Sequence, residues 1–160
     1  MENGTVKIDL GSGRNKPEGY IGIDRTQIID GNGDKRVDIL MDIEVMSLPF
    51  EDNTVFEVRA MNVLEHLREL CWVMNECHRV LKPGGRLIGV VPVAGTVEDF
   101  KDPTHQRHFI KDTFAYFMGE NKAFSDQPSR PKYANYGFLP WNGEVKQDGN
   151  LINFNLTPRK

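Results

Sequence analysis

Short apolar runs separated by polar, glycine-rich connections dominate the hydrophobic pattern of this chain. Seven of these runs have the length and composition of β-strands, at residues 6–10, 20–24, 37–41, 55–60, 87–92, 133–139 and 151–156. One long helix is predicted before the fifth run, because apolar residues recur at helical steps at Leu64, Leu67, Cys71, Met74, His78 and Leu81. It should stop at Lys82-Pro83-Gly84-Gly85, and a shorter helix is predicted over residues 111–118. The pattern therefore predicts a single α/β domain over residues 1–160.

Several connections between the expected strands are short or polar. Residues 14–20, 25–36 and 43–54 offer little apolar periodicity, whereas the crossover between parallel strands usually needs about ten or more residues that include a helix. We therefore expect a minimal α/β fold in which several crossover helices are shortened to loops.

Two glycines follow the first expected strand, and an aspartate ends the second. Gly11 and Gly13 allow a sharp turn without a Cβ atom, so that a ligand can lie against the backbone. A carboxylate in the place of Asp24 can accept hydrogen bonds from both hydroxyls of a ribose. The glycines could also form only a tight turn, and Asp24 could be only a strand-end residue. Together they favour a site for an adenosine-containing cofactor.

The segment after Gly13 distinguishes between two such cofactors. A dinucleotide needs a helix N-terminus for its pyrophosphate, opened by a third glycine. Here Lys16 occupies the position of that glycine, Pro17 follows, and the connection is too short for a full helix. A cofactor that has a ribose but no phosphate, S-adenosylmethionine, fits better than NAD.

The chain resembles the class I S-adenosylmethionine-dependent methyltransferases, particularly small stand-alone bacterial and phage members. The resemblance rests on five segments in the family's order: Asp9–Gly13, Gly22–Asp24, Asp42 with residues 48–53, residues 61–67 and residues 79–87. It implies a Rossmann-like, seven-stranded mixed sheet whose last two strands form a hairpin. It also implies a cofactor site formed by Asp9, Gly11, Ser12, Gly13, Asp24, Asp42 and Asn62.

Some of these positions have alternatives. Asp9 could instead bind loop amides, and Asp38 competes with Asp42 for the adenine side. Asn62 could also cap a helix. Glu65 is expected to have a structural role, because an acidic residue is favoured at the start of a helix.

The segment of residues 102–109, which follows the fifth expected strand, carries two histidines and an arginine. A loop at the carboxyl end of such a strand faces the substrate in open α/β sheets. His105 and His108 are thus candidate catalytic bases for an oxygen acceptor, since an ordinary histidine titrates near neutral pH. The alternative is a polar loop without a chemical role. Residues 93–101 are expected to be the flexible part of a lid.

Composition limits the remaining choices. The formal charge of −3 and the lack of a basic block make nucleic acid an improbable partner. No apolar run is long enough to span a membrane, and residues 1–5 do not look like a signal peptide. The two cysteines point in different directions on the expected helix, and no Cys/His cluster has the spacing of metal ligands. We expect a cytoplasmic protein without a metal, and the sequence leaves its oligomeric state open.

The sequence thus predicts a methyltransferase that moves the methyl group of S-adenosylmethionine in line to a small molecule, metabolite or glycan. The alternative is a cofactor-binding module without activity of its own, or one completed by a partner subunit. A nicotinamide-dependent oxidoreductase fits less well, because the phosphate-binding helix is missing.

Overall fold

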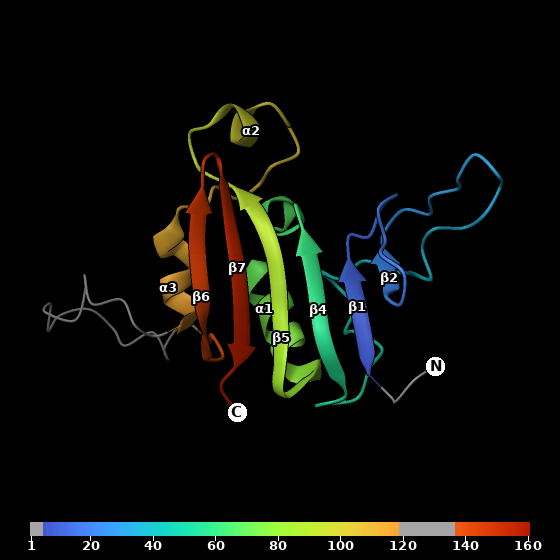
Figure 1. Ribbon diagram of the computed structural model, residues 1–160, viewed down its shortest axis with the longest axis horizontal. Helices are drawn as coiled ribbons and strands as arrows, with labels where there is room; N and C mark the ends of the chain where they lie inside the picture. Colours follow the sequence, from blue (N-terminus) through green and yellow to red (C-terminus); the bar gives the residue numbers. More distant parts are fainter. Residues whose placement is uncertain (1–4, 119–136) are drawn as a thin grey trace, which may run out of the picture.

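A seven-stranded mixed sheet forms the centre of the protein. The computed structural model describes residues 5–118 and 137–160. The sheet order is β3-β2-β1-β4-β5-β7-β6 (Figure 1). The strands are β1 (Val6–Leu10), β2 (Ile21–Asp24), β3 (Ile39–Leu40), β4 (Val55–Met61), β5 (Leu81–Pro92), β6 (Trp141–Asp148) and β7 (Leu151–Pro158). Neighbouring strands from β3 to β5 are parallel, and β7 runs antiparallel to both β5 and β6. The predicted sheet, with its closing hairpin, is confirmed.

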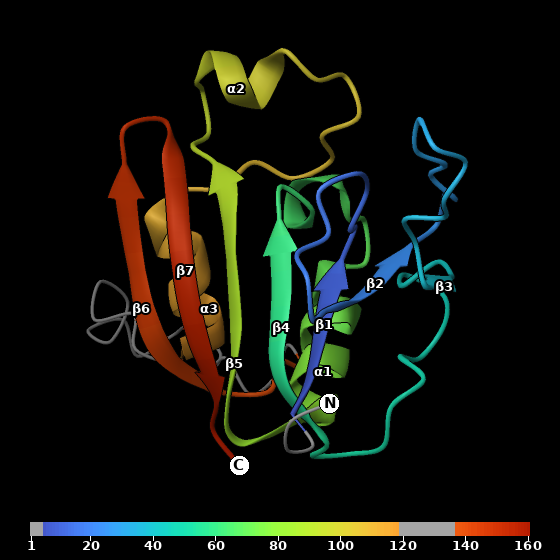
Figure 2. The ribbon, with the colours of Figure 1, turned by 45° about the vertical axis from the view of Figure 1, so that its right-hand side comes forward.

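Helices are few and short in the described residues. They are η1 (Leu64–His66), α1 (Leu70–Val80), α2 (Val97–Phe100), η2 (Lys111–Phe114) and α3 (Ala115–Met118), of which η1 and η2 are 3₁₀ helices. Figure 2 shows α1 and α3 behind the same face of the sheet, with α2 beyond the upper ends of β5 and β7. The expectation of a minimal fold with shortened crossovers is confirmed. None of the described helices has the length and apolar character needed to cross a bilayer.

The face of the sheet that α1 covers holds the hydrophobic core. Alternate residues of β1, β4, β5 and β7 point to one face in register, and their side chains are fully or almost fully buried: Ile8, Leu10, Val58, Ala60, Leu87, Val91, Ile152, Phe154 and Leu156. Helix α1 adds Val73, Met74 and Cys77 to this core. Burial raises the pKa of the Cys77 thiol to about 12, whereas Cys71 is exposed, and both cysteines are free.

The alternating residues on the other face form polar pairs. Arg59 Nη1 donates to Asp9 Oδ1 across β4 and β1 at 2.8 Å. Glu57 of β4 accepts hydrogen bonds from Tyr20 and from Arg86 of β5. On this second face, the polar side chains of the described residues pair with one another across neighbouring strands, so the hydrophobic core is one-sided there.

The long helix is shorter than predicted. The apolar stripe that begins at Leu64 divides between η1 and α1, because the chain becomes extended at Leu67 (φ −83°, ψ 130°). At the other end, β5 begins at Leu81 directly after α1. The expected stop and turn lies inside β5 as an irregularity, where the register with β4 jumps from Leu81 to Arg86.

The sixth strand lies elsewhere than predicted. Residues 133–136 of the expected strand lie outside the described residues, and residues 137–139 are not in a strand. The strand is instead β6, whose exposed residues are mostly polar. Trp141 at its start is fully buried and contacts His78 edge to face, so His78 packs in the interior.

Gly89, in the middle of β5, packs closely against the neighbouring strands. A Cβ atom there would lie 2.0 Å from the Ala60 carbonyl oxygen and 2.4 Å from Phe154 Cζ. We expect Gly89→Ala to lower the free energy of unfolding by about 3 kcal/mol, since overpacking of a rigid core displaces backbone. Gly31→Ala is the control, because its Cβ would meet open space. Equal denaturation midpoints for the two variants would contradict the close packing.

Candidate active site

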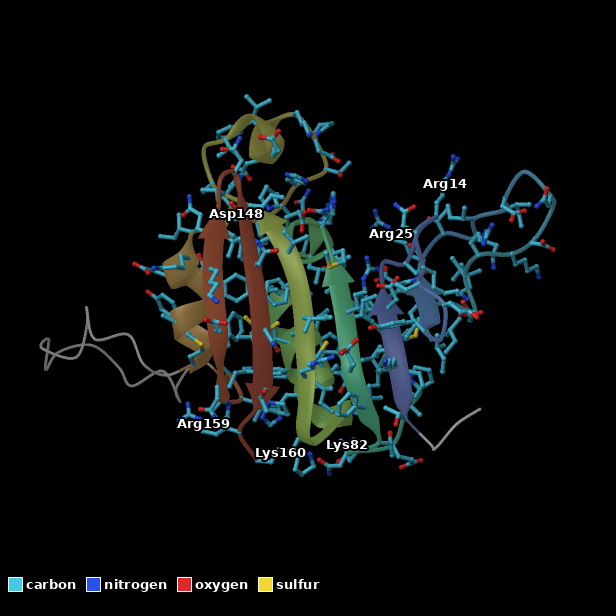
Figure 3. All side chains as sticks on the ribbon, viewed as in Figure 1. Arg14, Arg25, Lys82, Asp148, Arg159 and Lys160 are labelled. Carbon is cyan, nitrogen blue, oxygen red and sulfur yellow. The ribbon has the colours of Figure 1, made fainter. Side chains whose placement is uncertain are left out.

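A cavity of about 260 Å³ opens at the carboxyl ends of β1, β2 and β4. Its walls combine apolar residues with acidic, basic and neutral polar ones: Gly11, Ile23, Asp24, Arg25, Met41, Asp42, Ile43, Glu44, Asn62, Val63, His66, Leu67 and Thr104. Figure 3 shows Arg14 and Arg25 at this end of the sheet, whereas Lys82, Arg159 and Lys160 lie at the opposite end. Four of the predicted cofactor residues, Gly11, Asp24, Asp42 and Asn62, meet in this one cavity.

The turn after β1 needs its glycines. Gly11 has φ +57°, and a Cβ atom there would lie 2.6 Å from Val63 Cγ2 on the cavity wall. Gly13 has φ +49°, and its amide donates to Asp24 Oδ2 at 3.1 Å. Gly11 therefore lets the backbone form part of the wall, while Gly13 acts on the cavity through the orientation of Asp24.

Asp24 is the last residue of β2, Asp42 lies just after β3, and both side chains are held by backbone amides. Asp24 Oδ1 accepts from the Thr26 amide at 2.9 Å, and Asp42 Oδ1 accepts from the Glu44 amide at 2.9 Å. Asp38, the competing acid, instead accepts from Lys16 Nζ and the Gly22 amide, both at 2.6 Å. Of the two, Asp42 lines the cavity.

Two other predicted cofactor residues lie outside the cavity wall. Asp9 is buried on the polar face of the sheet under Arg59, and burial raises the pKa of its carboxyl although Arg59 opposes the shift. Ser12 is buried with its hydroxyl against Gly22, where an added Cβ would come within 2.8 Å of Ser12 Oγ. In this structure Asp9 and Ser12 pack next to the glycine turn and are not part of the cavity wall.

Asn62 lies on the cavity wall without capping a helix. Its φ is +52°, its amide donates to the Val90 carbonyl at 2.9 Å, and the residue that precedes η1 is Val63. The possible helix-cap role is therefore wrong. The left-handed backbone turns the chain at the end of β4 so that Val63 and His66 both reach the cavity.

The loop of residues 102–109 lies over the turn that follows β4. The Glu65 carbonyl accepts from the amides of Gln106 and Arg107 at 2.7 and 2.9 Å. Thr104 Oγ1 lies 3.0 Å from His66 Nδ1, and both of these residues line the cavity. The loop thus reaches the cavity through Thr104.

The two predicted histidines are both anchored to Asp99 of α2. His105 Nδ1 lies 2.7 Å from the Asp99 backbone oxygen, and His108 Nδ1 lies 2.9 Å from Asp99 Oδ1. The expected flexible lid therefore contains a short helix with a buried acid. The His105 ring lies 4.8 Å from the His66 ring, next to the cavity wall, whereas the His108 side chain is about half exposed.

Glu65 is the residue whose importance sequence analysis missed. It lies in the first turn of η1, as expected, but its side chain is 1% exposed and Oε2 has no hydrogen-bond partner among the described residues. Burial raises the pKa of Glu65 to about 7. Burial and the adjacent His105 lower the pKa of His66. Buried groups with such shifts occur often at functional sites.

Comparison with known proteins agrees with the fold. A family model described as a methyltransferase domain matches residues 18–89. Over 98% of the chain, the structure is similar to a SAM-dependent methyltransferase from Aquifex aeolicus, with a TM-score of 0.61, 16% identity and 83% of that chain covered. Residues 18–89 thus match a methyltransferase domain, and the chain has the fold of S-adenosylmethionine-dependent methyltransferases. The predicted family and its cofactor are confirmed.

Other similar proteins add detail about the methyltransferase domain. Methyltransferase GfsG of Streptomyces halstedii is 39% identical over 57 residues, which are 35% of this chain and 20% of that protein. A methyltransferase from Haloferax volcanii, solved in complex with the Trm112 methyltransferase activator, has a TM-score of 0.62 at 16% identity, covering 99% of this chain and 85% of that one. The chain spans less than a third of the length of the curated relatives that it matches.

The cavity of this methyltransferase domain suits its family's cofactor. Backbone approach at Gly11, apolar walls such as Ile23 and Val63, and the carboxylates of Asp24 and Asp42 match a ligand with a flat base and a ribose. Residues 14–20 form no helix after the glycine turn, so the structure offers no helix N-terminus to a pyrophosphate there.

Proposed function

We propose that this chain transfers a methyl group from S-adenosylmethionine to a small-molecule acceptor, such as a metabolite or an exposed glycan hydroxyl. The observation that supports this most is that the cavity lies beside the loop of residues 102–109, which we call the histidine loop. Gly11, Asp24, Asp42 and Asn62 line one side, while His66 and Thr104 close the side toward His105. We place the protein in the cytoplasm, where its two free cysteines would remain reduced.

Each residue has a distinct part in the proposed reaction. Asp24 would accept hydrogen bonds from the ribose, Asp42 would face the adenine side, and Gly11 would let the cofactor lie against the backbone. When bound, S-adenosylmethionine supplies an electrophilic methyl group. The chain contributes alignment of the acceptor and exclusion of water, and His105 would take the proton from an acceptor hydroxyl. His108 is the second candidate for this base.

Titration calorimetry tests the cofactor assignment directly. We expect binding of S-adenosylmethionine and S-adenosylhomocysteine, and no binding of NAD, because no helix follows the glycine turn. Methyl transfer would then be followed with radiolabelled donor and a fractionated extract. Binding of NAD, or failure to bind either sulfur compound, would contradict the proposal.

A second candidate function is a cofactor-binding module that a partner subunit completes. Two observations favour it: the shortened crossovers, and exposed apolar side chains near β3 at Leu40, Val45 and Met46. The Haloferax volcanii structure also contains an activator protein. Labelled product formed by the pure chain alone would favour the independent enzyme.

A further inference from the structure

Glu65 has a buried carboxylate oxygen without a hydrogen-bond partner among the described residues. The carboxylate is 1% exposed, and Oε2 accepts no hydrogen bond. Desolvating an ionised carboxylate is costly unless a counter-charge or donors compensate. The acidic side chains of Asp99 and Asp102 lie near enough to act on Glu65 and add negative charge around it. A cation at this place would compensate all three.

The hydrogen bonds of two nearby histidines fix where their lone pairs are. His105 Nδ1 must carry a proton, because the Asp99 carbonyl that it contacts at 2.7 Å can only accept. Thr104 Oγ1 donates to Asp102 Oδ1 at 2.6 Å, so this hydroxyl accepts from His66 Nδ1 at 3.0 Å. Both neutral rings therefore have an unprotonated Nε2, the form of imidazole that binds metals.

These residues also lie close together. Glu65, His66 and His105 each offer a potential ligand atom, and the three atoms lie within 4.8 Å of one another. In a tetrahedral zinc site, with bonds of about 2.0–2.2 Å, ligand atoms are about 3.3 Å apart. Small rotations of the half-buried His66 and His105 rings would bring the ligand atoms to the separation of a zinc site.

We propose that Glu65, His66 and His105 bind a divalent transition-metal ion, with zinc as the best match. Two imidazole nitrogens and one carboxylate suit zinc, whereas magnesium and calcium prefer ligand sets made of oxygen. The Asp99 carbonyl and the Thr104 hydroxyl supply the outer hydrogen bonds that orient metal-binding histidines. The sequence could not show this set, because His105 lies in a different connection from Glu65 and His66.

Metal binding by these residues does not require the proposed methyl transfer. If the proposed function holds, the ion would lie beside the cavity wall at His66, with a coordination position open for an acceptor oxygen. A metal-bound hydroxyl loses its proton more easily, so His105 would act in the loaded protein as a ligand instead of a base.

Metal titration of the whole chain tests the proposal without any acceptor. After dialysis against a chelator, Zn²⁺ is titrated by calorimetry, and Co²⁺ is followed by its visible absorption. We expect one ion per chain, and at least a tenfold loss of affinity in His66→Ala, His105→Ala and Glu65→Gln. Thr104→Val should weaken binding about tenfold as well, because it removes the hydrogen bond that orients His66.

His108→Ala is the matched control for metal binding. It lies in the same loop and is also anchored to Asp99, but it is not part of the three-residue cluster. We expect this variant to bind Zn²⁺ like the wild type. No Zn²⁺ binding by the wild type, or equal affinity in His66→Ala and His105→Ala, would overturn the proposal.

Discussion

In the metal-free protein, replacing His105 by alanine is expected to slow methyl transfer by about 10²–10⁴-fold, the usual contribution of a general base. The same change should flatten the rise of the rate with pH and leave the dissociation constant of S-adenosylmethionine unchanged. His105 is not among the residues that line the cavity, although it contacts His66 there. Steady-state rates with labelled donor, measured across pH, give the result.

His108→Ala separates the two candidate bases. Its ring is more exposed and pairs with the Asp99 carboxylate, so we expect a smaller loss of rate than in His105→Ala. Lys101→Ala controls for changes at the end of the α2 segment, since its side chain is largely exposed. Wild-type rates in both histidine variants would show that these residues only build the loop.

Asp24→Ala is expected to weaken S-adenosylmethionine binding tenfold or more. In the proposed site, the change would remove two charge-assisted hydrogen bonds to the ribose, each contributing about 1.5–3 kcal/mol. It also removes the acceptors of the Gly13 and Thr26 amides, so part of the loss will come from a looser turn.

Asp24→Asn distinguishes these two causes. Asparagine can still accept one of the amide hydrogen bonds but carries no charge, so an equally large loss would assign the effect to the ribose contacts. Asp34→Ala, in the exposed part of the following loop, should bind like the wild type. Unchanged affinity in Asp24→Ala would place the ribose elsewhere.

Strands whose side chains pack in the core were predictable from the sequence, whereas the edge strand β6 was not. Apolar residues alternate with polar residues in β1 and in β7, because one face of each strand packs in the hydrophobic core. In β6 only Trp141 is buried, and most of the strand faces solvent. Its residues are held by backbone pairing with β7, a contact that leaves no hydrophobic period in the sequence.

The predicted start of the long helix at Leu64 was wrong for a related reason. Leu64 and Leu67 lie in step with the apolar face of α1, and both are buried. The core thus selects apolar residues in η1 and α1 alike, so periodicity could not reveal the extended residue between them.

The cavity was easier to predict than the residues around it. Gly11, Asp24 and Asp42 occur at strand ends, where chain order alone brings them together. The contact of Glu65 and His66 with His105 depends on how one connection folds over another. Hydrogen bonds to a backbone carbonyl make that contact, and any residue type can supply them.

Those backbone hydrogen bonds also affect how an acceptor is received. The Glu65 carbonyl fastens the amides of Gln106 and Arg107, and Asp99 holds both neighbouring histidines. The histidine loop is therefore ordered by folding itself, before any ligand arrives. An acceptor bound as proposed would meet a preorganised surface and would lose little conformational entropy there, so more of the contact free energy would remain to favour association.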